Sequence, residues 1–332
     1  MKKTTDTQEI NSALARALEF ITSLETKNRE MRHCLELAQE ACLSRAPVLI
    51  LGESGVGKSL IAQSLHYASP NRADQCVIVD CIRTAPADVD IVIFGIAFDR
   101  DESNRQEGAI ARAGKGTIIL DSVDLLPIST QTELLRVLQF GKYRLVGSDK
   151  EHDAYARFVA TSSANLAEKM AGGLFREDFL YAIGEVTLRI PPLRSRAEDI
   201  PTLINACILS ANRRYGKNVV SISKTALDFL KRYELPGNIR ELNRIINRAI
   251  IDLQRDTIYI EDLGFQVDPP ANPAAFGADI LSLEEVERLH IVKAVAHAKG
   301  NVRAAARILR VTEAALRRKM ENYHINAENG RR

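Results

Sequence analysis

The chain has 332 residues, of which 45% are hydrophobic and 27% are charged, and its formal net charge is +2. This length exceeds a usual single core, so we expect two or three domains of an ordinary soluble protein. No apolar run is long enough to span a membrane, and the first residues lack the apolar centre of a secretion signal. A cytoplasmic protein without membrane contact is therefore expected.

Short apolar runs alternate with helical patterns in the first part of the chain. Residues 1–25 are expected to form a polar helical lead-in, and a helix is expected over 28–44. Buried strands are then predicted at 48–51, 76–79, 117–120 and 158–160, with helical patterns such as 60–67 and 131–140 between them. This alternation is typical of an α/β fold with a largely parallel sheet.

Helical periodicity replaces the strand pattern from about residue 196. It predicts helices over 199–215, 223–233 and 238–253, which form a small helical subdomain. A Pro/Ala/Gly-rich linker covers 269–277, and Ser282–Glu285 is a capping box that opens a helix ending near Gly300. Two shorter helices are expected at about Val302–Leu309 and Thr312–Tyr323.

The most specific motif is a phosphate loop that follows the first predicted strand and opens a helix. Its glycines allow backbone N–H groups to converge on phosphates, and the N-terminus of the next helix adds positive potential. Lys58 is expected to reach the β- and γ-phosphates, and the Ser59 hydroxyl to bind Mg²⁺. The loop consists of Gly52, Glu53, Ser54, Gly55, Val56, Gly57, Lys58 and Ser59, and it predicts that ATP and Mg²⁺ are bound.

A second strand should complete this chemistry. Asp121 ends the apolar run that begins at Gly116, where a carboxylate can hold Mg²⁺; a helix N-cap is the alternative role. The next residue, Ser122, stands where an ATPase of this kind has a glutamate that polarises the attacking water. A serine hydroxyl is too weak a base at neutral pH for this role.

Further segments make the resemblance to a family specific. The chain resembles the AAA+ transcription activators of the NtrC type, which remodel sigma-54 RNA polymerase, from about Asn28 to Ile325. The resemblance implies an AAA+ P-loop core with a parallel sheet and a helical lid, followed by an all-α Fis-type helix-turn-helix domain. The segments that carry it are the phosphate loop, 134–139, 174–178, 191–196, 235–242 and the C-terminal helices.

The resemblance assigns roles to single residues. Arg176 matches an arginine finger that acts in trans on a neighbouring subunit's γ-phosphate, and Arg240 matches the lid arginine that senses the nucleotide of its own subunit. Thr161 and Ser162 match the polar end of the sensor strand, and Thr161 is taken as a nucleotide-site residue. Planar, permanently charged guanidinium groups suit contacts to phosphate oxygens.

Four departures from the family pattern fall on parts that hydrolyse ATP or transmit its effect. The stretch 94–108 lacks the Gly-Ala-Phe-Thr-Gly-Ala motif that touches sigma-54 and is strongly charged. Ser122 replaces the catalytic glutamate, Asp80 replaces the asparagine that restrains it, and Ala182 occupies the second arginine-finger position. An alternative is that Asp80 acts as a displaced base, although catalytic geometry tolerates a shift of only about 1 Å. Asp124 is a weaker candidate because an exposed position past the strand end is expected for it.

The C-terminal helices have helix-turn-helix spacing. Ile308, Leu316 and Met320 are expected in their small core, and Thr312 is expected to cap the second helix. Residues 301–332 contain eight Lys or Arg and three Glu, a net charge of +5 that suits a DNA-phosphate surface. An oligomerisation device is the alternative. The predicted DNA-contacting residues are Arg303, Arg307, Thr312, Arg317, Arg318 and Lys319.

These observations predict an ATP-binding, DNA-binding transcription regulator with weak or absent hydrolysis, not a stand-alone sigma-54 activator. The alternatives are an active ATPase that uses Asp80, and a scaffold subunit that supplies Arg176 to an intact homologue. Expected partners are double-stranded DNA, other copies of the chain (a dimer through the C-terminal domain, a ring or hexamer through the AAA+ core) and, as a candidate, RNA polymerase. The expected segments are a lead-in over 1–25, an α/β subdomain over 26–195, a lid over 196–266, a linker over 267–280 and a DNA-binding domain over 281–332.

Overall fold

A computed structural model describes residues 26–99, 103–265, 291, 294–295, 298, 301–309 and 311–323. The expected lead-in over 1–25, the linker, most of the helix expected from Ser282, and Arg310, Arg331 and Arg332 lie outside the described residues. The chain divides into two compact units, with the division between Gly264 and Phe265. Among the described residues, no helix combines the length and apolar character needed to cross a bilayer.

The first unit contains a five-stranded parallel sheet in the order β2-β5-β8-β1-β9. Residues alternate between its two faces: Leu49 of β1 faces one cluster of buried side chains, while Val48 and Ile50 face the other. The strands are β1 (Val48–Leu51), β2 (Cys76–Asp80), β5 (Thr117–Asp121), β8 (Arg157–Ser162) and β9 (Val186–Arg189). The predicted α/β class with a parallel sheet is therefore confirmed, although strand β9 was not anticipated.

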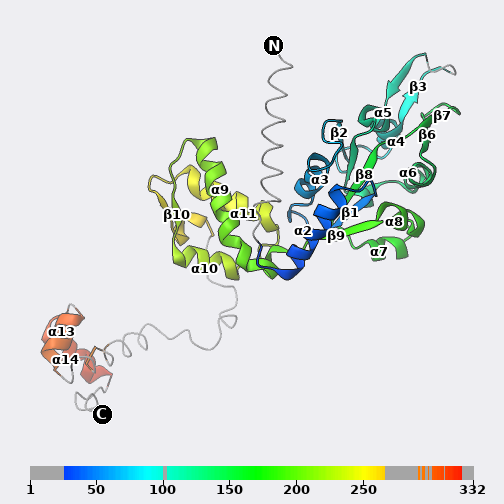
Figure 1. The fold of residues 1–332 in the computed structure, drawn as a ribbon. Helices are drawn as coiled ribbons and strands as arrows, with labels where there is room; N and C mark the ends of the chain where they lie inside the picture. The colour runs from blue at the N-terminus through cyan, green and yellow to red at the C-terminus, as the bar shows by residue number, and fades with distance from the viewer. Residues whose placement is uncertain are drawn as a thin grey trace. The chain divides into compact units, whose positions relative to one another are not determined.

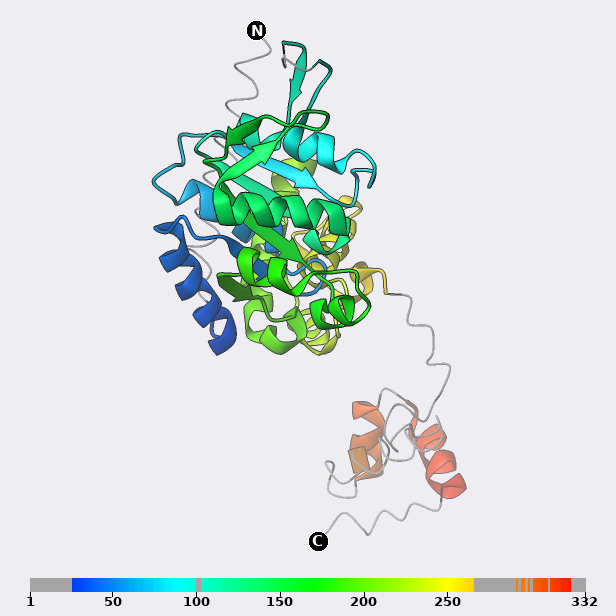
Figure 2. The ribbon, with the colours of Figure 1, turned by 90° about the vertical axis from the view of Figure 1, so that its right-hand side faces the viewer.

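Helices cover both faces of the sheet (Figures 1 and 2). One face carries α2 (Arg29–Cys42) and α3 (Lys58–Tyr67). The Asn28 side chain begins α2 by accepting a hydrogen bond from Met31 N at 2.9 Å. The other face carries α4 (Val89–Phe94), α5 (Ala109–Ala113), α6 (Ile128–Phe140) and α8 (Glu177–Ile183).

Smaller elements connect these layers. Two antiparallel hairpins extend the core, and the first of them projects at the end remote from the lid in Figure 1. The hairpin strands are β3 (Gly95–Ala97) with β4 (Arg105–Glu107), and β6 (Lys142–Arg144) with β7 (Glu151–Asp153). The remaining core elements are the 3-10 helix η1 (Val123–Leu125) and helix α7 (Leu166–Ala171).

The helical subdomain expected after residue 196 is present within the same unit. Pro201 lies in the first turn of its longest helix, and Gly216 ends that helix in the left-handed conformation that glycine tolerates best. The elements are η2 (Leu193–Asp199), α9 (Ile200–Tyr215), β10 (Ser221–Ile222), α10 (Lys224–Arg232), α11 (Asn238–Ile251), β11 (Thr257–Ile258) and η3 (Ile260–Leu263).

The second unit contains α13 (Val302–Ile308) and α14 (Glu313–Asn322), which pack on each other. Leu316 and Met320 are buried between them, as predicted. Ile308 is 53% exposed, so its predicted place in the core is wrong. Ala305 and Ala306 of α13, with the half-buried Leu309 that follows the helix, pack in this core instead. The centre of the face that these three residues form lies about 100° around the helix axis from Ile308.

Candidate nucleotide site and nucleic-acid interface

The phosphate loop lies between the end of β1 and the start of α3, as the sequence predicts. Gly55 and Gly57 have φ values of +82° and +108°, which side chains other than glycine rarely adopt. A Cβ atom on Gly55 would also lie 2.2 Å from the Gly237 carbonyl oxygen of the lid. The loop and the lid are therefore in close contact, and the motif glycines permit that contact.

The Lys58 ammonium group lies inside the loop. Its Nζ donates to the carbonyl oxygens of Gly52 at 2.8 Å and Glu53 at 2.9 Å. Burial is the main cause of the lowered pKa of Lys58, and the nearby Asp121 carboxylate opposes that shift. A phosphate would exchange these carbonyl contacts for charge-assisted hydrogen bonds to the same ammonium group.

Asp121 and two hydroxyl groups converge at the ends of neighbouring elements. The Ser59 hydroxyl donates to Asp121 Oδ2 at 3.1 Å, and the Thr161 hydroxyl donates to Oδ1 at 2.5 Å. Hydroxyl and carboxylate oxygens are the donor set that Mg²⁺ prefers. Among the described residues no group of three or more His, Cys, Asp or Glu could hold a metal by itself, so such an ion would need phosphate oxygens as well.

Ser122 occupies a strained backbone position beside this network. Its φ and ψ are 65° and 55°, which is left-handed and unusual for a non-glycine residue. Its backbone N–H donates to the Thr161 hydroxyl at 3.1 Å. The Thr161 side chain therefore bridges the backbone of residue 122 and the Asp121 carboxylate.

Asp80 pairs in register with Asp121 across β2 and β5. Its carboxylate Oδ1 accepts backbone hydrogen bonds from Ile82 at 3.0 Å and Arg83 at 3.2 Å. Its other oxygen lies 3.4 Å from Arg83 Nε. Asp80 therefore stabilises the turn that follows its own strand.

Asp124 is 8% exposed, so the prediction that it is an exposed carboxylate is wrong. The 3-10 turn after β5 directs it back toward β8, where the Ser162 hydroxyl donates to its Oδ1 at 2.6 Å. Asp121 and Asp124 are thus held by Thr161 and Ser162, two adjacent hydroxyl residues at the end of β8.

Three lid residues form hydrogen bonds to the phosphate loop. The sequence motif did not predict this role for two of them, Arg194 and Asn238. Arg194 donates to both oxygens of Glu53 at 2.7 and 2.5 Å, and Asn238 Nδ2 donates to Glu53 at 3.2 Å. These hydrogen bonds lower the Glu53 pKa to about 2. Arg240, which the family resemblance placed here, donates from Nη1 to the Ser54 hydroxyl at 2.9 Å.

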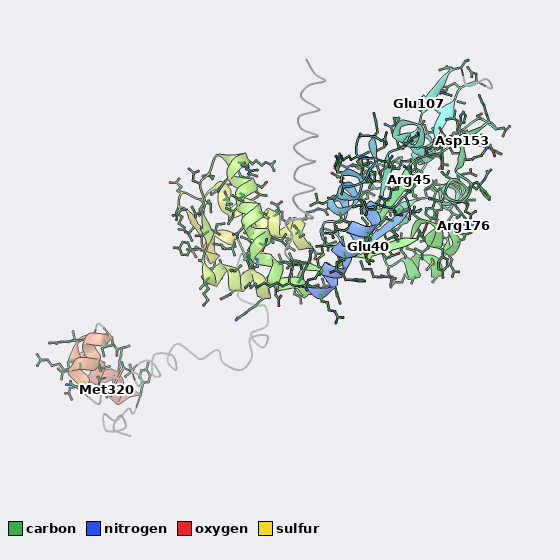
Figure 3. The ribbon with its side chains drawn as sticks, in the orientation of Figure 1. Glu40, Arg45, Glu107, Asp153, Arg176 and Met320 are labelled. Carbon is green, nitrogen blue, oxygen red and sulfur yellow. The ribbon has the colours of Figure 1, made fainter. Side chains whose placement is uncertain are left out.

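Arg176 lies apart from this network. It precedes α8, and Figure 3 labels it on the side of the core that faces away from the lid. Its guanidinium group forms two hydrogen bonds with Asp178, at 2.9 and 2.6 Å, which raise its pKa. It also donates to Thr132 of α6 at 3.3 Å. The charged stretch 94–108 forms the β3–β4 hairpin, with residues 100–102 outside the described chain and Phe98 exposed next to them.

The predicted DNA-contacting residues lie on α13, on α14 and in the turn between them. The Thr312 hydroxyl accepts a hydrogen bond from Ala315 N at 3.3 Å, so it caps α14 as predicted. Arg303, Arg307, Arg317 and Arg318 are exposed, and Lys319 is half-buried. Arg317 pairs with Glu313 one turn earlier at 2.9 Å.

Three family models match consecutive parts of the chain. Residues 24–189 match the sigma-54 interaction domain, 194–275 match the AAA+ ATPase lid domain, and 282–323 match the Fis family of bacterial regulatory proteins. The chain belongs to the NtrC-type, sigma-54-interacting transcription regulators. The fold class and the family expected from the sequence are therefore confirmed.

Curated relatives of this family cover most of the chain. The chain is 33% identical to the alginate biosynthesis transcriptional regulatory protein AlgB of Pseudomonas syringae pv. tomato, over 91% of the chain and 67% of the relative. It is 31% identical to the regulatory protein AtoC of Escherichia coli, over 98% and 72%, and 34% identical to the nitrogen fixation protein AnfA of Azotobacter vinelandii, over 91% and 61%. The chain thus spans about two thirds of the length of these relatives.

Solved structures give the same architecture. The crystal structure of NtrX from Brucella abortus in complex with ADP matches with a TM-score of 0.70 and 25% identity, over 97% of this chain and 73% of that chain. The NtrX complex with ATP matches with a TM-score of 0.67 and 26% identity, over 90% and 69%.

Proposed function

We propose that this chain is a DNA-binding transcription regulator that binds ATP and hydrolyses it weakly or not at all. Backbone N–H groups of 52–59 and Lys58 would hold the phosphates, and Ser59 and Asp121 would hold Mg²⁺, which supplies charge neutralisation of the phosphate oxygens. The Ser59–Asp121–Thr161 network and the bound lid arginine Arg240 support nucleotide binding. So does the similarity to NtrX, whose structures contain ATP and ADP.

The observation that carries the proposal is the chemistry of residue 122. Ser122 offers a hydroxyl where the family has a carboxylate, and its N–H is already bonded to Thr161. General bases contribute about 10²–10⁴-fold to rate, so the loss of the glutamate is a sufficient reason for weak hydrolysis. The Asp80 carboxylate is not free to replace it, because it accepts two backbone hydrogen bonds of its own turn.

The DNA-binding part of the proposal rests on α14. Its exposed Arg317 and Arg318 lie about one turn into a helix capped by Thr312, where the second helix of a helix-turn-helix contacts base edges. Arg303 and Arg307 on α13 would contact phosphates. The match to the Fis family supports this assignment and a dimer on a two-fold DNA site.

ATP would then act as a ligand that favours one oligomeric state and so sets DNA affinity. A ligand at 100 times its dissociation constant stabilises the state that binds it by about 2.7 kcal/mol, enough to shift a weak assembly. The chain would not activate sigma-54 polymerase by itself, since the hairpin that replaces the sigma contact is charged. Its place of action would be the cytoplasm, where bacterial DNA is found.

The test compares ATP with a non-hydrolysable ATP analogue in a DNA-affinity measurement, on a duplex enriched from a random library by the full chain. We expect both nucleotides to raise affinity equally, and Arg317→Ala with Arg318→Ala to weaken binding and relax base preference. A matched change of two exposed cationic residues in the lid, Lys231→Ala with Arg232→Ala, should leave DNA affinity and base preference unchanged. A response to ATP that the analogue fails to give would contradict a purely structural role for the nucleotide.

A second candidate is a scaffold subunit that completes the site of an intact homologue. The position of Arg176 away from its own lid favours it, because its guanidinium group makes no contact with the proposed nucleotide site of its own chain among the described residues. This role predicts that the chain raises phosphate release by a motif-complete homologue mixed with it, and that Arg176→Ala removes the increase. An unchanged rate in the mixture would exclude the scaffold role.

A further inference from the structure

A cavity of about 450 Å³ lies at the N-terminal ends of the central strands of the sheet. Pro47 precedes β1, Lys115 lies two residues before β5, and Arg157 is the first residue of β8. The phosphate loop follows the other end of β1. The candidate nucleotide site lies at the C-terminal ends of the strands, so the cavity is separate from it and lies at their opposite ends.

Three cationic residues line this cavity, and in the part of the chain that the structure describes no carboxylate pairs with them. Among the described residues, Arg45, Lys115 and Arg157 form no ion pair. Arg157 is 4% exposed, and its guanidinium donates from Nε to the Ala46 carbonyl at 3.2 Å and from Nη2 to the Ala41 carbonyl at 2.7 Å. Its Nη1 is buried without a hydrogen-bond partner. A buried, uncompensated charge is costly, and an anion in the cavity would offset it.

Arg45 is held at the cavity by two carbonyl groups. Its Nη2 donates to the carbonyl oxygen of Lys115 at 3.2 Å and to that of Tyr155. These contacts fix the guanidinium group while leaving its other N–H groups available. A fixed, planar group of donors recognises carboxylate or phosphate oxygens with little further loss of entropy.

The rest of the cavity wall is apolar. Val137 and Leu138 come from the last turns of α6, and the Phe158 side chain comes from β8. Small-molecule sites typically have volumes of about 300–1,000 Å³ and combine apolar walls with a few oriented polar groups. An inorganic anion would leave the apolar wall unused.

We propose that this cavity binds a small organic anion whose acidic group meets Arg45 and Lys115, close to the buried charge of Arg157, and whose apolar body packs on Val137, Leu138 and Phe158. The site is independent of the proposed nucleotide site, because no residue lines both. It would give this regulator a small-molecule input that does not compete with ATP.

Calorimetric titration of the full chain with phenyl phosphate, and separately with inorganic phosphate, tests the proposal. We expect one phenyl phosphate per chain, bound at least about tenfold more tightly than inorganic phosphate because the ring buries apolar area. Arg45→Ala with Lys115→Ala should weaken binding at least about tenfold, since each loses a charge-assisted hydrogen bond. Arg157 is kept, because its bonds to Ala41 and Ala46 also stabilise the fold.

Two controls separate this cavity from other basic sites. Lys58→Ala should leave phenyl phosphate binding unchanged, and so should Arg72→Ala with Lys231→Ala, which removes the same charges elsewhere on the surface. The proposal is overturned if phenyl phosphate does not bind at millimolar concentration, or if inorganic phosphate binds as tightly. It is equally overturned if Lys58→Ala abolishes binding, or if the Arg45 and Lys115 changes leave it intact.

Discussion

The phosphate-binding half and the hydrolytic half of the candidate nucleotide site differ in the side chains that they offer to a nucleotide. In the first half, Lys58 lies inside the phosphate loop, and the hydroxyls of Ser59 and Thr161 both donate to Asp121. In the second half, position 122 is a serine and the Asp80 carboxylate is bonded to its own turn. Binding a nucleotide and cleaving it depend on different residues, so one capacity can be lost while the other remains.

The largest expected effect falls on the phosphate-binding half. Lys58→Ala should remove most of the stabilisation that ATP with Mg²⁺ provides, about 2.7 kcal/mol at 100 times the dissociation constant. The measurement is the melting temperature of the full chain with and without millimolar ATP. In the unchanged protein ATP should raise the melting temperature by about 5–10 °C, and in Lys58→Ala the rise should be much smaller. Lys231→Ala serves as the control. If ATP does not shift the melting temperature of the unchanged protein, the proposal that the phosphate loop binds ATP is contradicted.

The next effect concerns the metal. Asp121→Asn keeps the hydrogen bonds of Ser59 and Thr161 possible but removes the charge that a Mg²⁺ ion needs. We expect ATP affinity in the presence of Mg²⁺ to fall at least about tenfold, a loss of about 1.4 kcal/mol, and to change little when EDTA removes the metal. Titrations of both proteins with and without EDTA measure this. Equal Mg²⁺ dependence in the two proteins would show that Asp121 is no metal ligand.

A smaller effect is expected on restoring the missing carboxylate. Ser122→Glu should raise phosphate release by about tenfold, below the 10²–10⁴-fold that a well-placed base contributes. The rise is partial because Asp80 and Ala182 remain and because residue 122 has a left-handed backbone that glutamate adopts at a cost. Ser122→Ala, which adds no base, is the matched control. A glutamate variant as slow as the alanine variant would mean that residue 122 does not limit hydrolysis.

The smallest effect concerns the contact between the phosphate loop and the lid. Hydrogen bonds from Arg194 and Asn238 lower the Glu53 pKa from 4.5 to about 2. A lowered pKa in the folded state stabilises the protein above pH 4.5, and this contribution is lost as the pH falls from 4.5 toward 2. Because the side chain is partly exposed, Glu53→Gln should cost less than about 1 kcal/mol at pH 7.

Urea unfolding at pH 7, 5 and 3 tests the sign of this effect. The difference between the unchanged protein and Glu53→Gln should be largest at pH 7 and should fall to about half at pH 3. Glu40→Gln, a change of an exposed glutamate on α2 (Figure 3), should show no such trend. A difference that grows toward acid would mean that the Glu53 carboxylate is not stabilised by the lid.

The sheet strands and the phosphate-binding residues could largely be predicted from the sequence, because apolar runs and motif spacing depend on local interactions. The strands that end in Leu51, Asp121 and Ser162 are apolar and short, and each is followed by polar residues at the carboxyl edge of the sheet. That edge is where ligands bind in parallel sheets. The phosphate loop, Asp121 and Thr161 therefore converge as their positions in the chain suggest.

Other features depend on tertiary packing that no local pattern encodes. The edge strand β9 mixes Val and Leu with Thr and Arg, which weakens its apolar signal. Asp124 is buried because a 3-10 turn returns it to Ser162, 38 residues further along the chain. The bonds from Arg194 and Asn238 to Glu53 span 141 and 185 residues. Ile308 was misplaced because small alanines, not the larger isoleucine, form the face that packs on α14.

The most direct test of the account is steady-state phosphate release by the purified full chain with saturating ATP and Mg²⁺, with and without the DNA duplex it selects. The account predicts turnover far below the typical enzyme value of about 10 s⁻¹ under both conditions, together with saturable ATP binding in the same preparation. Asp80→Asn should leave that low rate unchanged. Robust turnover in the unchanged protein, abolished by Asp80→Asn, would contradict the account and identify Asp80 as the base.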